Sequence, residues 1–567
     1  MNPQTGAAET ELNLLHFRIS AKGDGGYKQN VSFSLPLAFL KPDTSACRIG
    51  RSVFLRALGL IYLLAISSWW TQVGLLVGED GLEPASRLLD FLRDRLGAEG
   101  RSPQWALPNL FWLTGASDAA LHGACLSGCV FAIFVVIGRF TGPSLTGLWV
   151  IYLSLVNTGG VFMSFQWDIL LLETGWLALF LCPWSARSVW SDPPPLTPVN
   201  RAALVLVWFL IAKLMFFSGW VKLAWSSETT PEWWPAGTAM TFHYMTQPIP
   251  NGVAWWMHQL PAWFHKVSLW PMYFTELVLP FAICLGRWGR LAAASGFVGL
   301  MGLILLTGNF AYFNWLTIAL CLPLMHDGLW PRRWKRILRI RTSEHTPTSS
   351  RKRSLLRLAL ASPALLGIGL LDLRVVLTNL HDAPKPLLAS DLSPDWLDRF
   401  SDALAPFHFV SGYGLFRTMT TERPEIILEG STDGTTWLAY DFSWKVDEIG
   451  KRPAQVAPHQ PRVAWQFWFA ALEGHFDYRS RNAAWFERLV RKLFQGDPSV
   501  KSLLANDPFP DEPPQFLRAR LMRYEFTTPH ERQETGQWWK RSVVGEYLPE
   551  VVRPPDAPNV PSGREAR

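Results

Sequence analysis

Long apolar runs alternate with short polar segments over the first two thirds of the chain. About nine of these runs are candidate membrane spans, because a helix of about 20 apolar residues crosses the hydrocarbon core of a bilayer. They predict a polytopic helical membrane domain over residues 51–380, with 141–184 forming either two helices or one helix and a re-entrant piece. The runs are Ala57–Val77, Ala119–Gly138, Thr141–Gln166, Trp167–Trp184, Ala202–Trp225, Val267–Leu285, Leu291–Leu306, Phe310–Met325 and Leu355–Leu371.

Charge differs between the two sets of loops that these spans define. Segment 327–353 carries nine Lys or Arg against two acids, whereas the loop 78–118 on the other side carries seven acids and four Arg. Lys and Arg accumulate in cytoplasmic loops of membrane proteins. The N-terminal segment 1–50 and the basic loop 327–353 are therefore expected in the cytoplasm. An odd number of spans then places the chain beyond about residue 380 on the opposite side.

The outer loop 226–266 is unusually aromatic for a segment that is too polar to span. Amphipathic rings favour the membrane interface, so the loop is expected along the outer membrane surface. His243, His258 and His265 are spaced 15 and 7 residues apart, unlike the H-x₃₋₅-H spacing of zinc sites. We therefore expect no metal here, and these histidines with Gln247 are the candidate polar residues of the loop.

Residues 381–550 are soluble in composition and predict an extracytoplasmic α+β domain, rich in β structure. A β-hairpin is expected over 424–444, with Asp433-Gly434 in the turn and a half-buried second strand. Val463–Leu472 and Ala484–Phe494 are expected to be helices and Phe516–Thr527 a further strand, and a small sandwich with inserted helices is one arrangement that fits them. The tail 551–567 is expected to be disordered.

The amino-acid composition limits the classes of function that this chain can have. Charged residues make up 17% of the chain, below the roughly 25% of soluble proteins, and there are 30 Trp and 35 Phe. The net charge of +7 lies largely in loops between apolar runs, so membrane lipids are expected as partners and nucleic acid is not. Established catalytic motifs such as G-x-S-x-G, a P-loop or H-E-x-x-H are missing from the sequence, so we expect neither an enzyme nor a cofactor.

Four charged residues fall inside predicted spans: Asp168, Glu173, Lys213 and Glu276. Charges in lipid are costly, so they usually pair or line a cavity. Lys213 and Glu276 both lie near the predicted midplane. Lys213 is therefore expected to face the bundle interior within reach of Glu276 or, as a second choice, Glu173. Such a pair either orders the bundle or forms a substrate or proton site.

Several long strings resemble the lipase maturation factor family, and the short loops and polar tail lead us to expect a bacterial member. They include WDILLLETGWLALFLCPW at 167–184, TFHYMTQPIPNGVAWWMHQLPAWFHK at 241–266, LTGNFAYFNWLTIALCLPL at 306–324, SGYGLFRTMTTERPEIILEGSTDG at 411–434, APHQPRVAWQFWFAAL at 457–472 and NDPFPDEPPQFLRARLMRYEFT at 506–527. His459, Gln460 and Arg462 in the fifth string are the candidate residues of the C-terminal domain.

The resemblance implies a multi-pass membrane protein that helps secreted lipases fold and assemble. Animal members reside in the endoplasmic reticulum with a lumenal C-terminal domain, and in a bacterium the inner membrane and periplasm would be equivalent. The first hypothesis is thus a membrane-bound maturation factor with a secreted client. The alternatives are a membrane-embedded enzyme acting on a lipid or a membrane-proximal protein, and a transporter.

Overall fold

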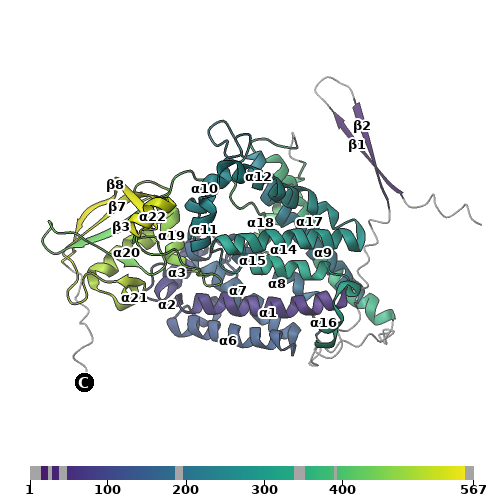
Figure 1. Ribbon diagram of the computed structural model, residues 1–567. Coiled ribbons are helices and arrows are strands. Elements are labelled where there is room, and N and C mark those ends of the chain that lie inside the picture. The colour runs from purple at the N-terminus through teal and green to yellow at the C-terminus, as the bar shows by residue number, and fades with distance from the viewer. Residues whose placement is uncertain are drawn as a thin grey trace, which may run out of the picture.

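The computed structural model describes residues 14–22, 28–36, 47–184, 196–337, 351–388 and 392–555. A bundle of long helices carries the C-terminal domain at one end, and α16 (Arg332–Ile337) lies at the other (Figure 1). Within the predicted N-terminal segment, β1 (Leu14–Lys22) pairs antiparallel with β2 (Lys28–Pro36). The tail 551–567 was predicted to be disordered, and most of it lies outside the residues that the structure describes.

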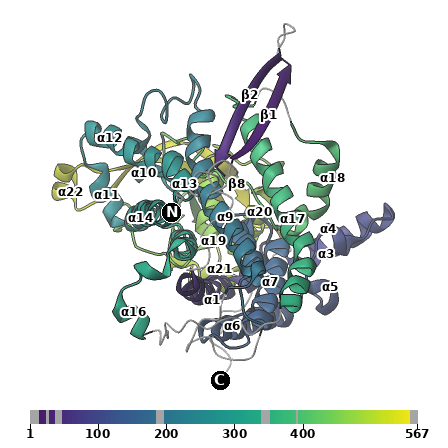
Figure 2. The same ribbon diagram turned by 90° about the vertical axis from the view of Figure 1, so that its right-hand side faces the viewer.

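Five helices of the described residues are long and apolar enough to cross a membrane, which defines a multi-pass helical region. These helices have sequence signals at their ends as well as apolar interiors. Thr197 and Asn200 form a capping box at the start of α9, with Pro198 as its first residue, and Ser117 caps α6. The five are α1 (Arg48–Trp70), α6 (Asp118–Val136), α9 (Pro198–Ala224), α14 (Gly286–Thr307) and α17 (Arg351–His381). Their arrangement around the bundle axis is visible in Figure 2.

The other predicted spans correspond to shorter or interrupted helices, so nine spans remains a prediction. The ambiguous region 141–184 forms two helices joined by a short 3-10 turn, Gly160–Met163. The run Val267–Leu285 is broken by a π-helical turn at Phe274–Val278, beside Pro271 and Pro280. The elements are α7 (Thr141–Thr158), α8 (Gln166–Leu179), α12 (Ala262–Tyr273), α13 (Leu279–Ala282) and α15 (Phe313–Cys321) with its 3-10 extension Leu322–Leu324.

Contacts between chain-distant residues define the two ends of the bundle. At the end we call the basic end, the Ile49 amide donates to Asp327 Oδ1 at 2.9 Å, and Asn200 Nδ2 donates to the Phe180 carbonyl at 2.7 Å. At the end we call the domain end, Asn309 Nδ2 donates to the Ala454 carbonyl at 2.9 Å. Both Val456 and Ala457 donate their amides back to Asn309 Oδ1.

The aromatic loop 226–266 folds into α10 (Ala239–Thr246), α11 (Gly252–His258) and the start of α12. Trp255 is fully buried and packs against Trp538 of the C-terminal domain. Trp234, Trp256 and Trp263, in contrast, are each about half exposed or more. The loop therefore divides its aromatic side chains between the C-terminal domain and the surface.

The C-terminal domain contains a four-stranded sheet in the order β4-β3-β7-β8 and a separate pair β5-β6. The predicted hairpin is confirmed, since β3 pairs antiparallel with β4 and Gly434 adopts φ +74°. The prediction of one continuous second strand was wrong, because β4 pairs with β3 whereas β5 pairs with β6. Tyr440 and Phe442 of this segment are buried, and Leu438 and Trp444 are exposed. The strands are β3 (Pro424–Ser431), β4 (Leu438–Ala439), β5 (Asp441–Phe442), β6 (Leu504–Asn506), β7 (Phe516–Phe526) and β8 (Trp539–Val552).

The predicted helices and strand of this domain are confirmed as α19 (Arg462–Ala471), α20 (Ala483–Gln495) and β7, whereas β8 was not predicted. Trp465 and Phe467 of α19 pack in one core with Leu428 of β3. The remaining helices are short or peripheral. They are α2 (Val73–Val77), α3 (Ala85–Ala98), α4 (Pro103–Ala106), α5 (Phe111–Thr114), α18 (Asp395–Leu404), α21 (Pro498–Lys501) and α22 (Pro529–Thr535).

Candidate functional site

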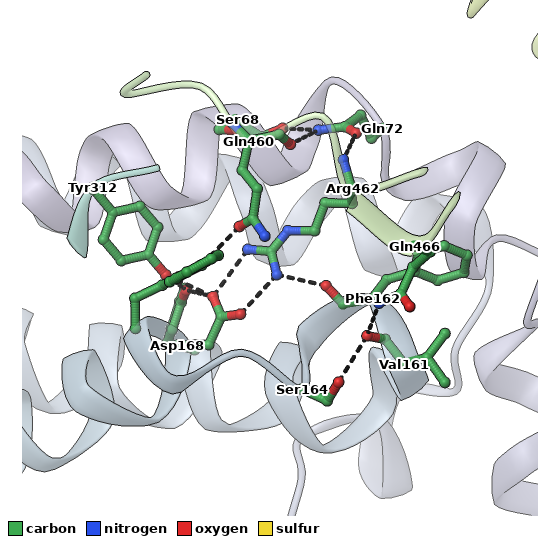
Figure 3. A network of polar contacts seen from close by, with 12 residues as sticks. Ser68, Gln72, Val161, Phe162, Ser164, Asp168, Tyr312, Gln460, Arg462 and Gln466 are labelled. Carbon is green, nitrogen blue, oxygen red and sulfur yellow. Dashed lines mark hydrogen bonds and ion pairs between the residues drawn. The ribbon is translucent and has the colours of Figure 1, made fainter. Parts of the chain in front are cut away.

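A buried ion pair joins the C-terminal domain to the membrane helices (Figure 3). Arg462, the first residue of α19, donates to both oxygens of Asp168 in α8 at 2.7 and 2.9 Å, and to the Phe162 carbonyl at 2.5 Å. Arg462 is 1% exposed and Asp168 is fully buried. A bidentate pair of this kind fixes orientation as well as position, so α19 is locked onto α8.

Two tyrosines complete the shell around Asp168. Tyr152 of α7 and Tyr312, which precedes α15, both donate to Asp168 Oδ1, at 2.7 and 2.6 Å. The two hydroxyls lie 2.5 Å apart. Burial alone would lower the pKa of Arg462, but the adjacent Asp168 carboxylate outweighs it and raises that pKa. The Arg462 guanidinium therefore stays charged although it is desolvated, and three elements of the helical region converge on it.

The end of α1 forms the other side of this junction. Ser68 Oγ lies 2.9 Å from His459 Nδ1 and accepts the Gln460 amide at 3.0 Å. Gln72 binds the backbone of Gln460 and Arg462, and the Gln460 side chain accepts from Trp167 Nε1 at 2.9 Å. The candidates His459, Gln460 and Arg462 thus meet the intramembrane candidate Asp168 in one network, which we call the junction.

A second buried cluster is centred on a lysine inside the bundle. Lys213 of α9 donates to Glu173 of α8 at 2.7 Å and to Asp372 of α17 at 2.6 Å. The predicted first-choice partner Glu276 was wrong, and the second choice Glu173 is confirmed. Tyr413 and the Ser411 amide, from the segment that leads into the C-terminal domain, cap Glu173 Oε2 at 2.6 and 3.0 Å.

Asp372 escaped prediction because it directly follows the predicted end of the last span, Leu371, and so was counted outside the apolar run. The helix α17 in fact continues to His381. Lys222 was missed because it lies three residues from the end of its predicted span, where a lysine ordinarily snorkels to the interface. It is instead 4% exposed and takes Glu276 as its partner.

The Lys222–Glu276 pair borders a cavity of about 320 Å³, which we call the chamber. Lys222 Nζ donates to the two Glu276 oxygens at 2.9 and 2.8 Å and to the Ser218 carbonyl at 2.8 Å. Most other lining side chains are apolar. They include Leu214, Met215, Trp233, Met240, Val253, Met257, Phe264, Met272, Leu300, Met301, Leu303, Ile304, Leu306, Phe310, Phe313, Leu415 and Phe416.

The four candidates of the outer loop do not form a single site. His243 lines the chamber, whereas Gln247 donates to the Thr307 carbonyl at 2.7 Å and joins the loop to the end of α14. His258 and His265 lie near one another, and burial lowers the pKa of His258 to about 4. Among the residues with described positions, no three His, Cys, Asp or Glu side chains gather as a metal site would require.

Arg423 is a connection that sequence reasoning missed. It is 1% exposed and donates to the carbonyls of Met245, Gln247 and Pro248 at 2.8, 2.5 and 2.9 Å, and to Glu425 at 2.7 Å. Its only sequence signal was its position in the string 411–434, immediately before β3. The guanidinium fixes the loop after α10 to the sheet.

A larger groove of about 690 Å³ opens beside the junction, between the turn 161–165 and the C-terminal segment 466–482. Its lining is mostly polar and includes Gln466, Glu473, His475, Asp477 and Arg481. Phe469, which lines it, is 40% exposed, and the nearby Leu472 and Tyr478 are 39% and 77% exposed. We call this feature, with these three apolar side chains, the junction groove.

The helices and the junction define a class: a multi-pass membrane protein whose C-terminal domain, which contains strands, is fixed to the helical region by a buried ion pair and the hydrogen bonds around it. Sequence comparison narrows the class. The model of the lipase maturation factor transmembrane domain matches residues 49–332, and that of the lipase maturation factor C-terminal domain matches residues 409–549. The chain belongs to the lipase maturation factor family.

Relatives named lipase maturation factors agree with this assignment along most of their length. Lipase maturation factor 2 of Gallus gallus is 34% identical, with 88% of this chain and 81% of that protein aligned. Lipase maturation factor 1 of Bos taurus is 33% identical, with 89% of each chain aligned, and lipase maturation factor 2 of Homo sapiens is 32% identical. No solved structure matches this chain.

Proposed function

We propose that this protein is a membrane-bound maturation factor for a secreted lipase. The observation that carries the proposal is the match to both domains of the family, together with relatives named lipase maturation factors that align over more than four fifths of their length. The rival function of a membrane-embedded enzyme is not favoured, because these relatives are named maturation factors and not enzymes. Membrane lipids surround the helices, and the client is the partner that the family name implies.

The client surface in this proposal is the junction groove. It combines a polar floor, which can bind backbone groups of an incompletely folded chain, with the exposed apolar side chains Phe469, Leu472 and Tyr478. Apolar surface beside polar groups is typical of protein-binding sites. The Asp168–Arg462 pair beneath the groove holds its two walls, the turn 161–165 and α19, in a fixed relation.

We infer that the chain crosses the membrane nine times, with the basic end in the cytoplasm. Support comes from α8 and α15, which are short but each run from the domain end to the basic end. Gln166, at the start of α8, accepts the Gly414 amide at 3.2 Å, while Phe180, after its end, contacts Asn200. In a cysteine-free background, Arg333→Cys and Thr432→Cys should be labelled from opposite faces by an impermeant maleimide. Labelling of both from one face would remove a span.

The compartment follows from this orientation. The C-terminal domain and the junction groove are then lumenal if the protein resides in the endoplasmic reticulum, and periplasmic if it is a bacterial inner-membrane protein. In either location a secreted client meets the groove after translocation, on the side where it folds. No catalytic residue or cofactor is needed for this role.

The function is tested in cells that lack their own maturation factor and express a secreted lipase. The full chain should raise lipase activity per amount of secreted lipase protein, and Tyr478→Glu combined with Phe469→Glu should abolish most of that gain and weaken co-purification with the client. Val543→Glu is the matched control, because Val543 is 55% exposed but lies on β8, outside the groove. No gain with the full chain would refute the function, whereas equal loss in the control would refute only the groove.

A further inference from the structure

The chamber is built by an irregular segment of the chain. Glu276 lies in the π-helical turn Phe274–Val278, which interrupts the helix between α12 and α13. A Cβ atom at Gly219 would lie 2.8 Å from the Cβ of Glu276, so only glycine allows α9 to approach this turn so closely. Single π-helical turns often occur at functional sites, because they displace one side chain from the regular helix.

The interior of the chamber is apolar and uncharged overall. At about 320 Å³ it is roughly twice the volume of an apolar protein cavity that binds benzene, and it falls within the range of ligand pockets. Lys222 and Glu276 neutralise one another, and all three ammonium hydrogens have acceptors. The pair therefore offers little to an anionic or cationic ligand.

One polar side chain in the chamber lacks a partner. His243 of α10 is 8% exposed, and its Nδ1 atom is buried without a hydrogen bond. Burial, with a smaller contribution from Lys222, lowers the pKa of His243 to about 4, so the ring is neutral at neutral pH. A buried polar atom without a partner costs free energy, and a neutral polar group of a ligand would remove that cost.

Some side chains that line the chamber are also exposed on the surface of a candidate membrane helix. Leu303 and Leu306, on the last turns of the membrane helix α14, line the chamber and are 63% and 60% exposed, and Val253 of α11 is 43% exposed. Exposed large apolar side chains on a membrane helix contact lipid tails, which are as apolar as leucine. A lipid tail can therefore move from the bilayer into the chamber without crossing water.

We propose that the chamber binds the acyl chain of a bilayer phospholipid, which enters past Val253, Leu303 and Leu306 and places its neutral ester group within reach of His243. The occupied chamber brings lipid into contact with Phe416 and Leu415, in the segment that leads to β3. The site is distinct from the junction groove and does not depend on which client the groove binds.

The test uses the full chain in phosphatidylcholine nanodiscs that contain a trace of phosphatidylcholine with a diazirine in one acyl chain. After illumination, mass spectrometry compares labelling of peptides from α10, α11 and the end of α14 with labelling of α6 in the same molecules. The exposed side chains Leu126, Val130 and Ile133 of α6 report contact with bulk lipid. Chamber peptides should be labelled well above α6, and equal labelling would overturn the proposal.

Matched variants locate the site. Ile304→Trp fills the chamber, and Val253→Trp blocks its mouth at an exposed position that folding tolerates. Each should lower the ratio of chamber to α6 labelling roughly tenfold, which corresponds to about 1.4 kcal/mol of binding free energy. Leu305→Trp, on the same helix but outside the lining, should leave the ratio unchanged. His243→Phe should lower the ratio of chamber to α6 labelling less than either of the two chamber tryptophan variants does. His243→Gln should keep that ratio close to the value of the unchanged protein. An unchanged ratio in both tryptophan variants would overturn the site.

Discussion

The junction and the chamber are two buried sites near the domain end, and each holds an ion pair, but they differ in what surrounds it. Around Asp168 and Arg462, tyrosine hydroxyls, a backbone carbonyl and the rings of Trp69 and Phe165 occupy the space. Lys222 and Glu276, in contrast, line a cavity of about 320 Å³. A filled charged site fixes two parts of a molecule together, whereas a hollow one leaves room for something else. The comparison predicts that equivalent substitutions have unequal effects.

The largest effect is expected at the fully packed Lys213 cluster. Lys213→Met leaves Glu173 and Asp372 together without a cation, and stranding a buried charge costs about 3–5 kcal/mol. Two stranded carboxylates place this variant at the upper end of that range. Unfolding in mixed detergent micelles, followed by tryptophan fluorescence, measures the loss. The triple variant Lys213→Met, Glu173→Gln, Asp372→Asn should recover much of it, and no recovery would contradict the ionic explanation.

Arg462→Leu should rank second, near the lower end of about 3–5 kcal/mol, because Tyr152 and Tyr312 still donate to the stranded Asp168. The same unfolding measurement applies, and protease should cut the segment before β3 more readily. Arg518→Leu is the matched control. Its guanidinium pairs with Glu429 at 2.7 Å, but the side chain is 26% exposed, so a loss of at most about 1 kcal/mol is expected. A larger loss in the control would remove the contrast.

Lys222→Met should cost less than either, about 1–3 kcal/mol, because water or a lipid group can enter the chamber and solvate Glu276. This outcome would sharpen the comparison between a filled and a hollow site. If Lys222→Met destabilises the protein as much as Arg462→Leu, the chamber does not relieve the stranded charge. The unfolding midpoints of the two variants, measured in the same detergent, decide the question.

The smallest effect concerns pH at the junction. Burial, and secondarily the Arg462 charge, lowers the pKa of His459 in the folded protein. Below the ordinary histidine pKa near 6.5, the unfolded chain therefore binds a proton that the folded chain does not, and stability falls as pH decreases. The unfolding midpoint should drop between about pH 7.5 and about pH 5.5. His459→Gln should reduce that drop, and an unchanged drop in this variant would contradict the assignment to His459.

The sequence predicted secondary-structure elements better than it predicted the tertiary contacts between them. Apolar runs, the Asp433-Gly434 turn and the helix pattern at 463–472 are local signals, and each has a counterpart in the structure. The partner of Lys213 depended on which helices become neighbours, and only one of its two carboxylates was identified. Asp372 was missed because the predicted span ended one residue before it, at Leu371, whereas α17 continues to His381.

The junction and the chamber could not have been foreseen in the same way. Asp168 and Arg462 lie 294 positions apart, and no periodicity relates them. The chamber depends on a π-helical turn and on the absence of a side chain at Gly219, and neither has a distinct hydropathy signal. His243 was selected as a possible metal ligand and rejected, while its unpartnered nitrogen became visible only once the structure placed it at the chamber.

The same 294-residue separation sets a waiting time during synthesis. At about 5–20 residues per second, a ribosome reaches Arg462 roughly 15–60 s after it has made Asp168. Over that interval α8 has already been synthesised, and the cation that pairs with its carboxylate does not yet exist. Every nascent helical region therefore passes through a stage in which Asp168 lacks Arg462, and any chain that stops before residue 462 stays there. Recognition of that unpaired acid would let the cell separate unfinished molecules from complete ones before any client arrives.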